Sequence, residues 1–163
     1  MKNILVTRID DRLIHGQIVT SWIKAFPINH ILIVAEDLAK NQLMQRIYKS
    51  VAPSGVTVTI LDNKASADLL KQEPNKDENY LILVKTPDVL EFLFDQGIPI
   101  TKIVLGGMGA KPGRDTLIRN VSVNENELEC FRRLIDHGIQ IVYQLVPVEK
   151  EIDIKNAIER KQK

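Results

Sequence analysis

Short apolar runs of strand-like composition alternate along this chain with stretches whose apolar residues recur at helical spacing. The strand-like runs cover residues 4–6, 31–34, 56–61, 80–84, 102–105 and 140–145. The helical patterns cover residues 16–26, 38–51, 64–72, 88–96, 125–137 and 154–159. Parallel strands need crossover connections, which are usually helices, so this alternation favours parallel pairing. We therefore expect an α/β fold with an open, mostly parallel twisted sheet and helices on both faces.

Length and charge narrow the class of protein. The 163 residues, 44% of them hydrophobic, are enough for one sizeable core, so we expect a single domain over residues 1–163. A formal net charge of +1 gives no overall reason to expect nucleic-acid binding. No apolar run approaches the roughly 18–20 residues of a membrane-spanning helix. The lone Cys130 cannot form an intramolecular disulfide, so we expect it to be a buried thiol in a cytoplasmic protein.

The segment from Arg8 to Gln17, RIDDRLIHGQ, places one histidine directly after the first predicted strand and before the first predicted helix. The first turn of a helix has unpaired N–H groups, so an anion beside His15 would find donors at Gly16, Gln17 and Ile18. Gly16 has no side chain to block that approach. A neutral imidazole can attack a phosphoryl donor without a strong base. The segment therefore predicts a histidine that carries a phosphoryl group.

Two arginines and two aspartates accompany this histidine. An arginine hydrogen-bonded to a phosphate contributes about 1.5–3 kcal/mol, whereas the helix dipole contributes about 0.3–1 kcal/mol at an exposed site. Arg8 and Arg12 therefore matter more than the helix, and Asp10 or Asp11 is expected to orient the imidazole. The simpler interpretation is that the four charges pair on a solvated loop, at about 0–1 kcal/mol, and that His15 is a cap or a solvated residue. Spacing alone leaves both open.

Two further segments are expected at the same edge of the sheet. If the first strand neighbours the fourth, the loop with His15 faces residues 85–88. There Lys85 would add charge, and Thr86 either donates its hydroxyl to a phosphate or caps the helix that opens at Pro87. The fifth strand ends in the glycine-rich residues 106–109, which lack a nucleotide-binding pattern. We interpret them as a flexible loop at the rim of the site.

Residues 8–17, followed by Trp22, resemble the phosphorylation-site segment of the IIB component of mannose-family (mannose, fructose and sorbose) bacterial phosphotransferase systems. Members of that family carry a phosphohistidine in an Arg-Leu-(Ile/Leu)-His-Gly-Gln context. The similarity extends along the chain, because residues 104–108 and 138–147 are similar to the corresponding family segments. The resemblance implies an α/β fold with a largely parallel sheet, and it makes a homodimer an expectation, since members often dimerise.

The same resemblance implies that His15 receives a phosphoryl group from the phosphohistidine of a IIA partner and passes it to a sugar bound by membrane IIC and IID components. Arg12 is then the prime candidate to stabilise the transferring group, with Arg8 and Asp10 shaping the loop. Family sites carry the phosphoryl group on Nδ1, and transfer between two histidines needs no metal or cofactor. We expect the IIA donor to be a separate polypeptide, because the resemblance begins at the first residues. We expect a cytoplasmic protein that meets the membrane through IIC and IID.

Two other classes of protein remain as alternatives. A receiver-type signalling domain is phosphorylated on aspartate, and it would use Asp10 and Asp11 after the first strand, Asp62 after the third and Thr86 after the fourth. Against it, the fifth strand ends in glycine where a receiver has lysine, and a receiver does not account for the arginines and histidine of the first loop. The second alternative is a binding module whose basic loop recognises an acidic protein partner. Phosphoryl uptake on histidine distinguishes the three.

Overall fold

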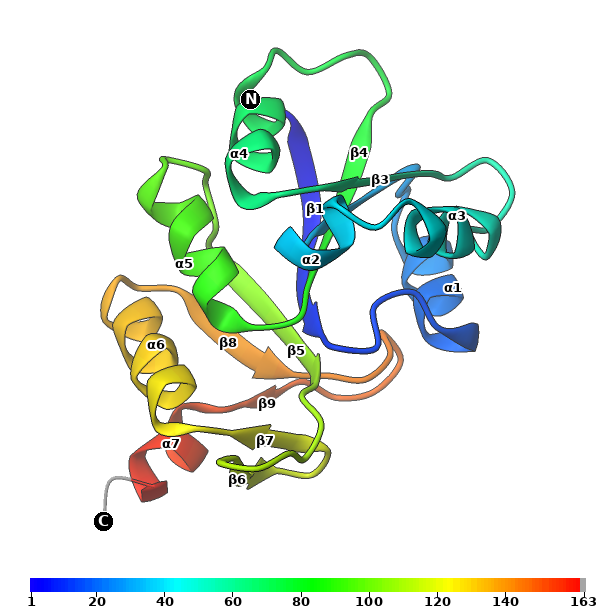
Figure 1. Ribbon diagram of the computed structural model, residues 1–163. Helices are drawn as coiled ribbons and strands as arrows, with labels where there is room; N and C mark the ends of the chain where they lie inside the picture. The colour runs from blue at the N-terminus through cyan, green and yellow to red at the C-terminus, as the bar shows by residue number, and fades with distance from the viewer. Residues whose placement is uncertain (162–163) are drawn as a thin grey trace.

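The computed structural model describes residues 1–161, with the side chains of Gln17 and Ile18 left out of the description. Its main feature is a seven-stranded sheet with the strand order β3-β2-β4-β1-β5-β8-β9 (Figure 1). The strands are β1 (Asn3–Asp10), β2 (His30–Val34), β3 (Thr57–Leu61), β4 (Asn79–Val84), β5 (Lys102–Gly107), β8 (Gln140–Tyr143) and β9 (Ile152–Asp153). Neighbouring strands are parallel except for β8 and β9. The predicted mostly parallel sheet is confirmed.

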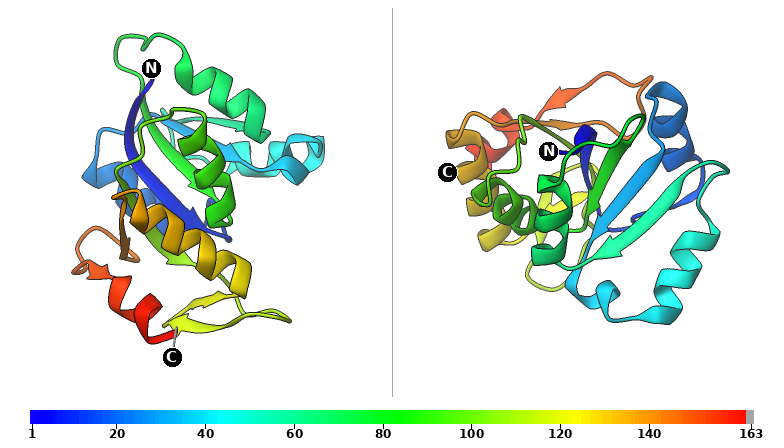
Figure 2. Two further views of the ribbon diagram at one scale, coloured as in Figure 1. Left: turned by 90° about the vertical axis from the view of Figure 1, so that its left-hand side faces the viewer. Right: turned by 90° about the horizontal axis from the view of Figure 1, so that it is seen from above.

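Helices cover both faces of the sheet (Figure 2). They are α1 (Gly16–Ala25), α2 (Glu36–Ala39), α3 (Gln42–Ser50), α4 (Asn63–Lys71), α5 (Pro87–Asp95), α6 (Glu125–Asp136) and α7 (Lys155–Lys161). One buried cluster joins the sheet to α4, α5, α6 and α7, and a second joins it to α1, α2 and α3. Within residues 1–161, none of these helices is long and apolar enough to cross a membrane.

The central strands explain why the sheet is covered on both sides. Residues 81–84 of β4 are all 0% exposed, and a strand buried on both faces is expected to be a continuous apolar run. β1 lies between β4 and β5, with Ile9 opposite Val84 and Asp10 opposite Gly107. The predicted pairing of the first and fourth strands is therefore confirmed. The loop after β1 thus begins where β4 and β5 also end.

The prediction of one continuous helix over residues 38–51 is wrong. The chain forms two helices there, α2 and α3, separated at Lys40 and Asn41. Asn41 accepts a hydrogen bond on its side chain from the N–H of Met44 (3.1 Å), so it caps a new helix instead of continuing the previous one. Apolar spacing alone did not reveal this interruption, because α2 and α3 both contribute apolar residues to the same core, Leu38 from α2 and Met44 and Tyr48 from α3.

The glycine-rich segment is also different from its prediction. Gly106 and Gly107 belong to β5, and Met108 forms a bridge with Val121 of a hairpin that the sequence did not predict. This hairpin consists of β6 (Asp115–Ile118) and β7 (Val121–Val123), paired antiparallel. The first part of the segment is therefore a buried strand end and not a flexible loop.

The α6 region agrees with its sequence pattern. Asn124 and Glu127 form a capping box at its start, and Gly138, at φ +86°, follows its end in the left-handed region. Cys130 is buried at 1% exposure, as predicted. Burial raises the pKa of the Cys130 thiol to about 12, so the thiol is protonated at neutral pH.

Candidate functional site

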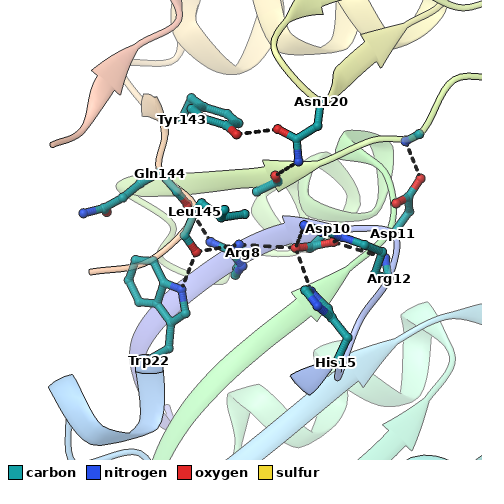
Figure 3. A network of polar contacts seen from close by, with 12 residues as sticks. Arg8, Asp10, Asp11, Arg12, His15, Trp22, Asn120, Tyr143, Gln144 and Leu145 are labelled. Atoms are coloured by element: carbon teal, nitrogen blue, oxygen red, sulfur yellow. Dashed lines mark hydrogen bonds and ion pairs between the residues drawn. The ribbon is translucent and has the colours of Figure 1, made fainter. Parts of the chain in front are cut away.

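Asp10, the last residue of β1, is a buried carboxylate that joins two arginines to His15 (Figure 3). Its Oδ2 accepts hydrogen bonds from Arg8 Nη2 (3.2 Å) and Arg12 Nη2 (2.9 Å), and it lies 3.2 Å from His15 Nε2. Its Oδ1 accepts from the backbone N–H of Arg12 (3.1 Å) and from Arg12 Nε (2.9 Å). The carboxylate is 0% exposed, so these donors replace water as its hydrogen-bond partners.

The charges around Asp10 keep this network ionic. Burial by itself would raise the pKa of the Asp10 carboxyl, but hydrogen bonds from Arg12 and the charge of Arg8 outweigh burial and hold that pKa below its ordinary value. The hydrogen bonds to Asp10 raise the pKa of Arg12. Burial lowers the pKa of Arg8, against the opposing charge of Asp10. A carboxylate can only accept, so in the neutral form of the His15 imidazole the hydrogen bond with Asp10 places the ring proton on Nε2 and leaves a lone pair on Nδ1.

Arg8 is the deepest group of the site. Its side chain is 1% exposed, and its guanidinium donates to the carbonyls of Gln144 (2.8 Å) and Leu145 (3.1 Å) as well as to Asp10. The guanidinium also lies over the ring of Trp22, 5.2 Å from the centroid, and Trp22 Nε1 donates to the same Leu145 carbonyl (3.1 Å). These contacts tie β1, α1 and the segment after β8 together. They leave Arg8 shielded from any incoming anion.

The position of the Arg8 guanidinium leaves no room for a side chain at residue 106. A side-chain carbon at Gly106 would lie 2.1 Å from Arg8 Nη2 and 2.9 Å from Asp10 Oδ2, much closer than atoms can approach. At Gly107 the same carbon would lie 3.1 Å from Arg12 Nη2, which is tight, but the Arg12 side chain is 42% exposed. Gly106 and Gly107 therefore allow the charged network to pack closely against the end of β5. The sequence pattern had indicated a flexible loop at these glycines.

Arg12 and His15 are the accessible members of the network, with side-chain exposures of 42% and 25%. His15 is the N-cap residue of α1, in an extended conformation, and its side chain makes no capping hydrogen bond. The imidazole is thus directed to Asp10 and not to the first turn of the helix. Leu13 and Gly16 adopt left-handed conformations, at φ +57° and +44°, which bend the chain between β1 and α1. The expectation of a solvated loop is wrong, because the ion pairs centre on a buried carboxylate.

Other predicted residues fall in different places. Gly16 begins α1 beside His15, whereas the side chain of Gln17 lies outside the described part of the structure. Thr86 is the N-cap of α5, with Pro87 in the first turn, but its hydroxyl makes no capping hydrogen bond. The Lys85 side chain does not join the network around Asp10, because its Nζ donates to Asp37 Oδ2 (3.0 Å) at the start of α2.

Sequence reasoning missed the residues that enclose the network from distant parts of the chain. The Tyr143 hydroxyl donates to Asn120 Oδ1, and Asn120 Nδ2 donates to the Gly106 carbonyl (2.9 Å) (Figure 3). Asp11, which had been an alternative to Asp10 for orienting the ring, accepts from the N–H of Gly109 (2.7 Å) instead. The one available signal was polar residues at strand ends, as with Asn120 after β6 and Tyr143 at the end of β8.

The receiver alternative fails on topology. Asp62 caps α4 by accepting from the N–H of Ala65 (2.7 Å), and it follows β3 at the outer edge of the sheet. Two strands, β2 and β4, separate β3 from β1, so Asp62 does not join Asp10 in one acidic pocket.

The chain is similar to known proteins over almost its whole length. The family described as PTS system sorbose subfamily IIB component matches residues 4–163. The PTS system fructose-specific EIIB component of Bacillus subtilis is 31% identical over 153 residues, which cover 94% of each chain. The PTS system mannose-specific EIIAB component of Escherichia coli is 30% identical over 95% of this chain, which spans 48% of that relative. The crystal structure of the IIBSor domain of the sorbose permease from Klebsiella pneumoniae superimposes with a TM-score of 0.90, at 27% identity and 97% coverage of both chains.

Proposed function

The chain belongs to the sorbose subfamily of IIB components of the phosphotransferase system, and from that membership we propose that it is a phosphocarrier whose carrier residue is His15. In this proposal His15 accepts a phosphoryl group from the phosphohistidine of a IIA protein. It then passes the group to a sugar bound by membrane IIC and IID components. The protein works on the cytoplasmic side of the membrane, where it meets both partners.

One observation carries the proposal: the contact between His15 Nε2 and the buried Asp10 carboxylate. This contact fixes the orientation of the imidazole and keeps the proton on Nε2. Nδ1 then has a free lone pair on a side chain that is one quarter exposed, at 25%. We propose that Nδ1 is the atom that carries the phosphoryl group.

Transfer between two histidines is balanced without any net proton movement. The lone pair of His15 Nδ1 attacks phosphorus while the P–N bond of the donor phosphohistidine breaks. The donor ring, which is protonated on its other nitrogen and therefore positively charged, leaves as a neutral imidazole. His15, which keeps its Nε2 proton, becomes a positively charged phosphoimidazole. The ionised Asp10 carboxylate stabilises that positive charge, because its pKa is held below the ordinary value. Since the transition state is loose, the protein contributes mainly position and charge.

The two arginines have different parts in this proposal. Arg12 is 42% exposed and lies on the same carboxylate as His15, so its guanidinium is available to the oxygens of the transferring group. Arg8, at 1% exposure, has the carbonyls of Gln144 and Leu145 and the Asp10 carboxylate as partners. It therefore acts through Asp10, as a positioning residue.

The first turn of α1 supplies further donors. His15 makes no capping hydrogen bond, so its side chain leaves the backbone N–H groups that follow it, at Gly16 and Gln17, available to an anion held beside His15. The hydroxyl of Thr86, which also makes no capping hydrogen bond, is a weaker candidate for the same role, from the neighbouring strand end of β4.

The proposal is tested by incubating the purified protein with phosphoenolpyruvate, the general phosphotransferase proteins and a mannose-family IIA protein. Intact mass is measured for the wild type and for His15→Ala. We expect one added phosphoryl group that is labile in acid, stable in base and absent from the variant. A label that survives His15→Ala would refute His15 as the carrier. Absence of any label in the wild type would leave only a binding module.

A further inference from the structure

The β6–β7 hairpin ends beside the site in a tight turn at Arg119 and Asn120. The turn is anchored on the end of β5, because the N–H of Met108 donates to the Asn120 carbonyl (3.2 Å) and Asn120 Nδ2 donates to the Gly106 carbonyl (2.9 Å). A side-chain carbon at Gly107 would lie 3.4 Å from Asn120 Nδ2 and 3.1 Å from Arg12 Nη2, so the turn and Arg12 border the same small space. Figure 3 shows Asn120 and Tyr143 facing each other at the rim of the network around Asp10.

Arg119 is the exposed cation of this turn. Its guanidinium lies over the ring of Tyr143, 5.9 Å from the centroid. Within the described residues, the side chains of Gln17 and Ile18 apart, this ring is its only partner and no carboxylate pairs with it. Its backbone is left-handed, at φ +41°, a conformation that is strained for a residue with a side chain.

The other arginines near the site already have carboxylate partners. Arg8 and Arg12 share the Asp10 carboxylate, and the buried Arg114 pairs with Glu127 (2.7 Å). Among the described residues, Arg119 is thus the arginine near this site for which no carboxylate partner is seen. An approaching acidic group gains more from an unpaired cation than from one whose charge is already compensated, because it displaces no existing ion pair.

We propose that Arg119 is a docking residue for an acidic side chain of the protein that donates the phosphoryl group to His15. This inference rests on the proposed phosphocarrier function and adds one contact of the donor complex. Arg119 binds the donor protein at the rim, while the phosphoryl group itself stays with His15 and Arg12. Tyr143 is the positioning residue, because its ring supports the guanidinium and its hydroxyl holds Asn120 in the turn.

The test compares a protein donor with a small one. The protein donor is the phosphorylated IIA protein, which has a surface that can dock. The small donor is phosphoramidate, whose P–N bond breaks with loss of ammonia as the bond to His15 forms, and which has no acidic side chain to place on Arg119. The variant is Arg119→Gly, since glycine adopts the left-handed conformation without strain and therefore removes the charge without threatening the fold.

For Arg119→Gly we expect the KM for the phosphorylated IIA protein to rise about 5–10-fold at about 0.01 M salt, with kcat within twofold of the wild type. The KM difference should disappear at about 1 M salt, where charges are screened within a few ångström. Labelling by phosphoramidate should proceed at the wild-type rate. Arg119→Lys, which restores the charge, should recover most of the KM.

Arg160→Gly is the matched control, because Arg160 is an exposed arginine of α7 whose guanidinium bonds to the carbonyl of Asn156 within its own helix. An equal KM rise in Arg160→Gly would overturn the inference, since the effect would then follow net charge and not this turn. An unchanged KM in Arg119→Gly, or an equal loss with both donors, would also overturn it. Absence of His15 labelling in the wild type with both donors would instead refute the phosphocarrier function itself.

Discussion

Replacing Gly106 with alanine is expected to lower the free energy of unfolding by about 3–5 kcal/mol. The new carbon would lie 2.1 Å from Arg8 Nη2, 2.5 Å from Arg8 Cζ and 2.9 Å from Asp10 Oδ2. Ordinary contacts are about 3.5–4.0 Å, so the guanidinium must move by more than an ångström. Arg8 is 1% exposed and is held by Asp10 and the Gln144 and Leu145 carbonyls, so its guanidinium cannot move that far without breaking these contacts.

The magnitude follows from what that movement breaks. Arg8 holds hydrogen bonds to the carbonyls of Gln144 (2.8 Å) and Leu145 (3.1 Å) and to Asp10 (3.2 Å), all on a buried cation. Breaking a buried ion pair costs about 3–5 kcal/mol, and overpacking a core costs about 1–3 kcal/mol. Because the two terms describe the same displacement, we take the ion-pair range as the whole cost and do not add them.

The assay is urea unfolding, with the free energy extrapolated linearly to water. Gly109→Ala is the control, since its side-chain carbon meets nothing closer than Asp11 Oδ2 at 3.4 Å, and its cost should stay below about 1 kcal/mol. Gly107→Ala should fall between the two, because the group that it contacts, Arg12 Nη2 at 3.1 Å, belongs to a half-exposed side chain. A Gly106→Ala protein within about 1 kcal/mol of the wild type would refute the close packing of Arg8 and Gly106.

Three further changes probe the same network. Arg12→Ala should slow phosphoryl transfer by about 10²–10³-fold in rapid-quench measurements, because it removes a charged hydrogen-bond donor at a half-exposed position. A melting temperature far below that of the wild type would contradict a purely catalytic loss. Trp22→Phe should cost about 0.5–1.5 kcal/mol in urea unfolding, because the ring over Arg8 remains while the hydrogen bond to the Leu145 carbonyl is lost; a cost near zero would show that this bond contributes nothing. Asp10→Asn tests the pH dependence. Arg12 and Arg8 outweigh burial and lower the folded pKa of Asp10 below its unfolded value of about 3.9. The stability that Asp10 contributes is therefore complete above about pH 5, begins to fall near the unfolded value and is lost as the pH drops on through the lower folded pKa. The stability difference between wild type and Asp10→Asn should therefore shrink from pH 6 to pH 3, and a constant difference would contradict the lowered pKa.

The sequence predicted the part of the site that is local in the chain. Asp10, Arg12 and His15 lie within six residues, so their meeting follows from a strand that ends and a helix that begins nearby. Their burial could not be read from spacing. It depends on β4 and β5 flanking β1, which is a property of the strand order.

The part of the site that the sequence did not predict comes from residues far along the chain, which contribute mainly through their backbone atoms. Arg8 bonds to backbone carbonyls 136 and 137 residues away, and a carbonyl leaves no mark on residue identity. Gly106 was visible but misinterpreted, because a glycine that permits close approach and one that permits bending look alike in sequence. The β6–β7 hairpin escaped prediction because its strands are only four and three residues long and β6 has no buried residue, although β7 is buried throughout.

The pairing of two arginines with one carboxylate resolves a conflict that the proposed chemistry creates. If Arg12 turns towards an incoming phosphoryl group, it gives up hydrogen bonds to Asp10, and a carboxylate at 0% exposure without a cation is strongly destabilised. Arg8 prevents this, because it stays on Asp10 Oδ2 and is itself held by two carbonyls and the Trp22 ring. Asp10 can therefore remain ionised beside His15 throughout transfer, when the positive phosphoimidazole needs it most. On this argument the buried arginine is what allows the exposed one to move.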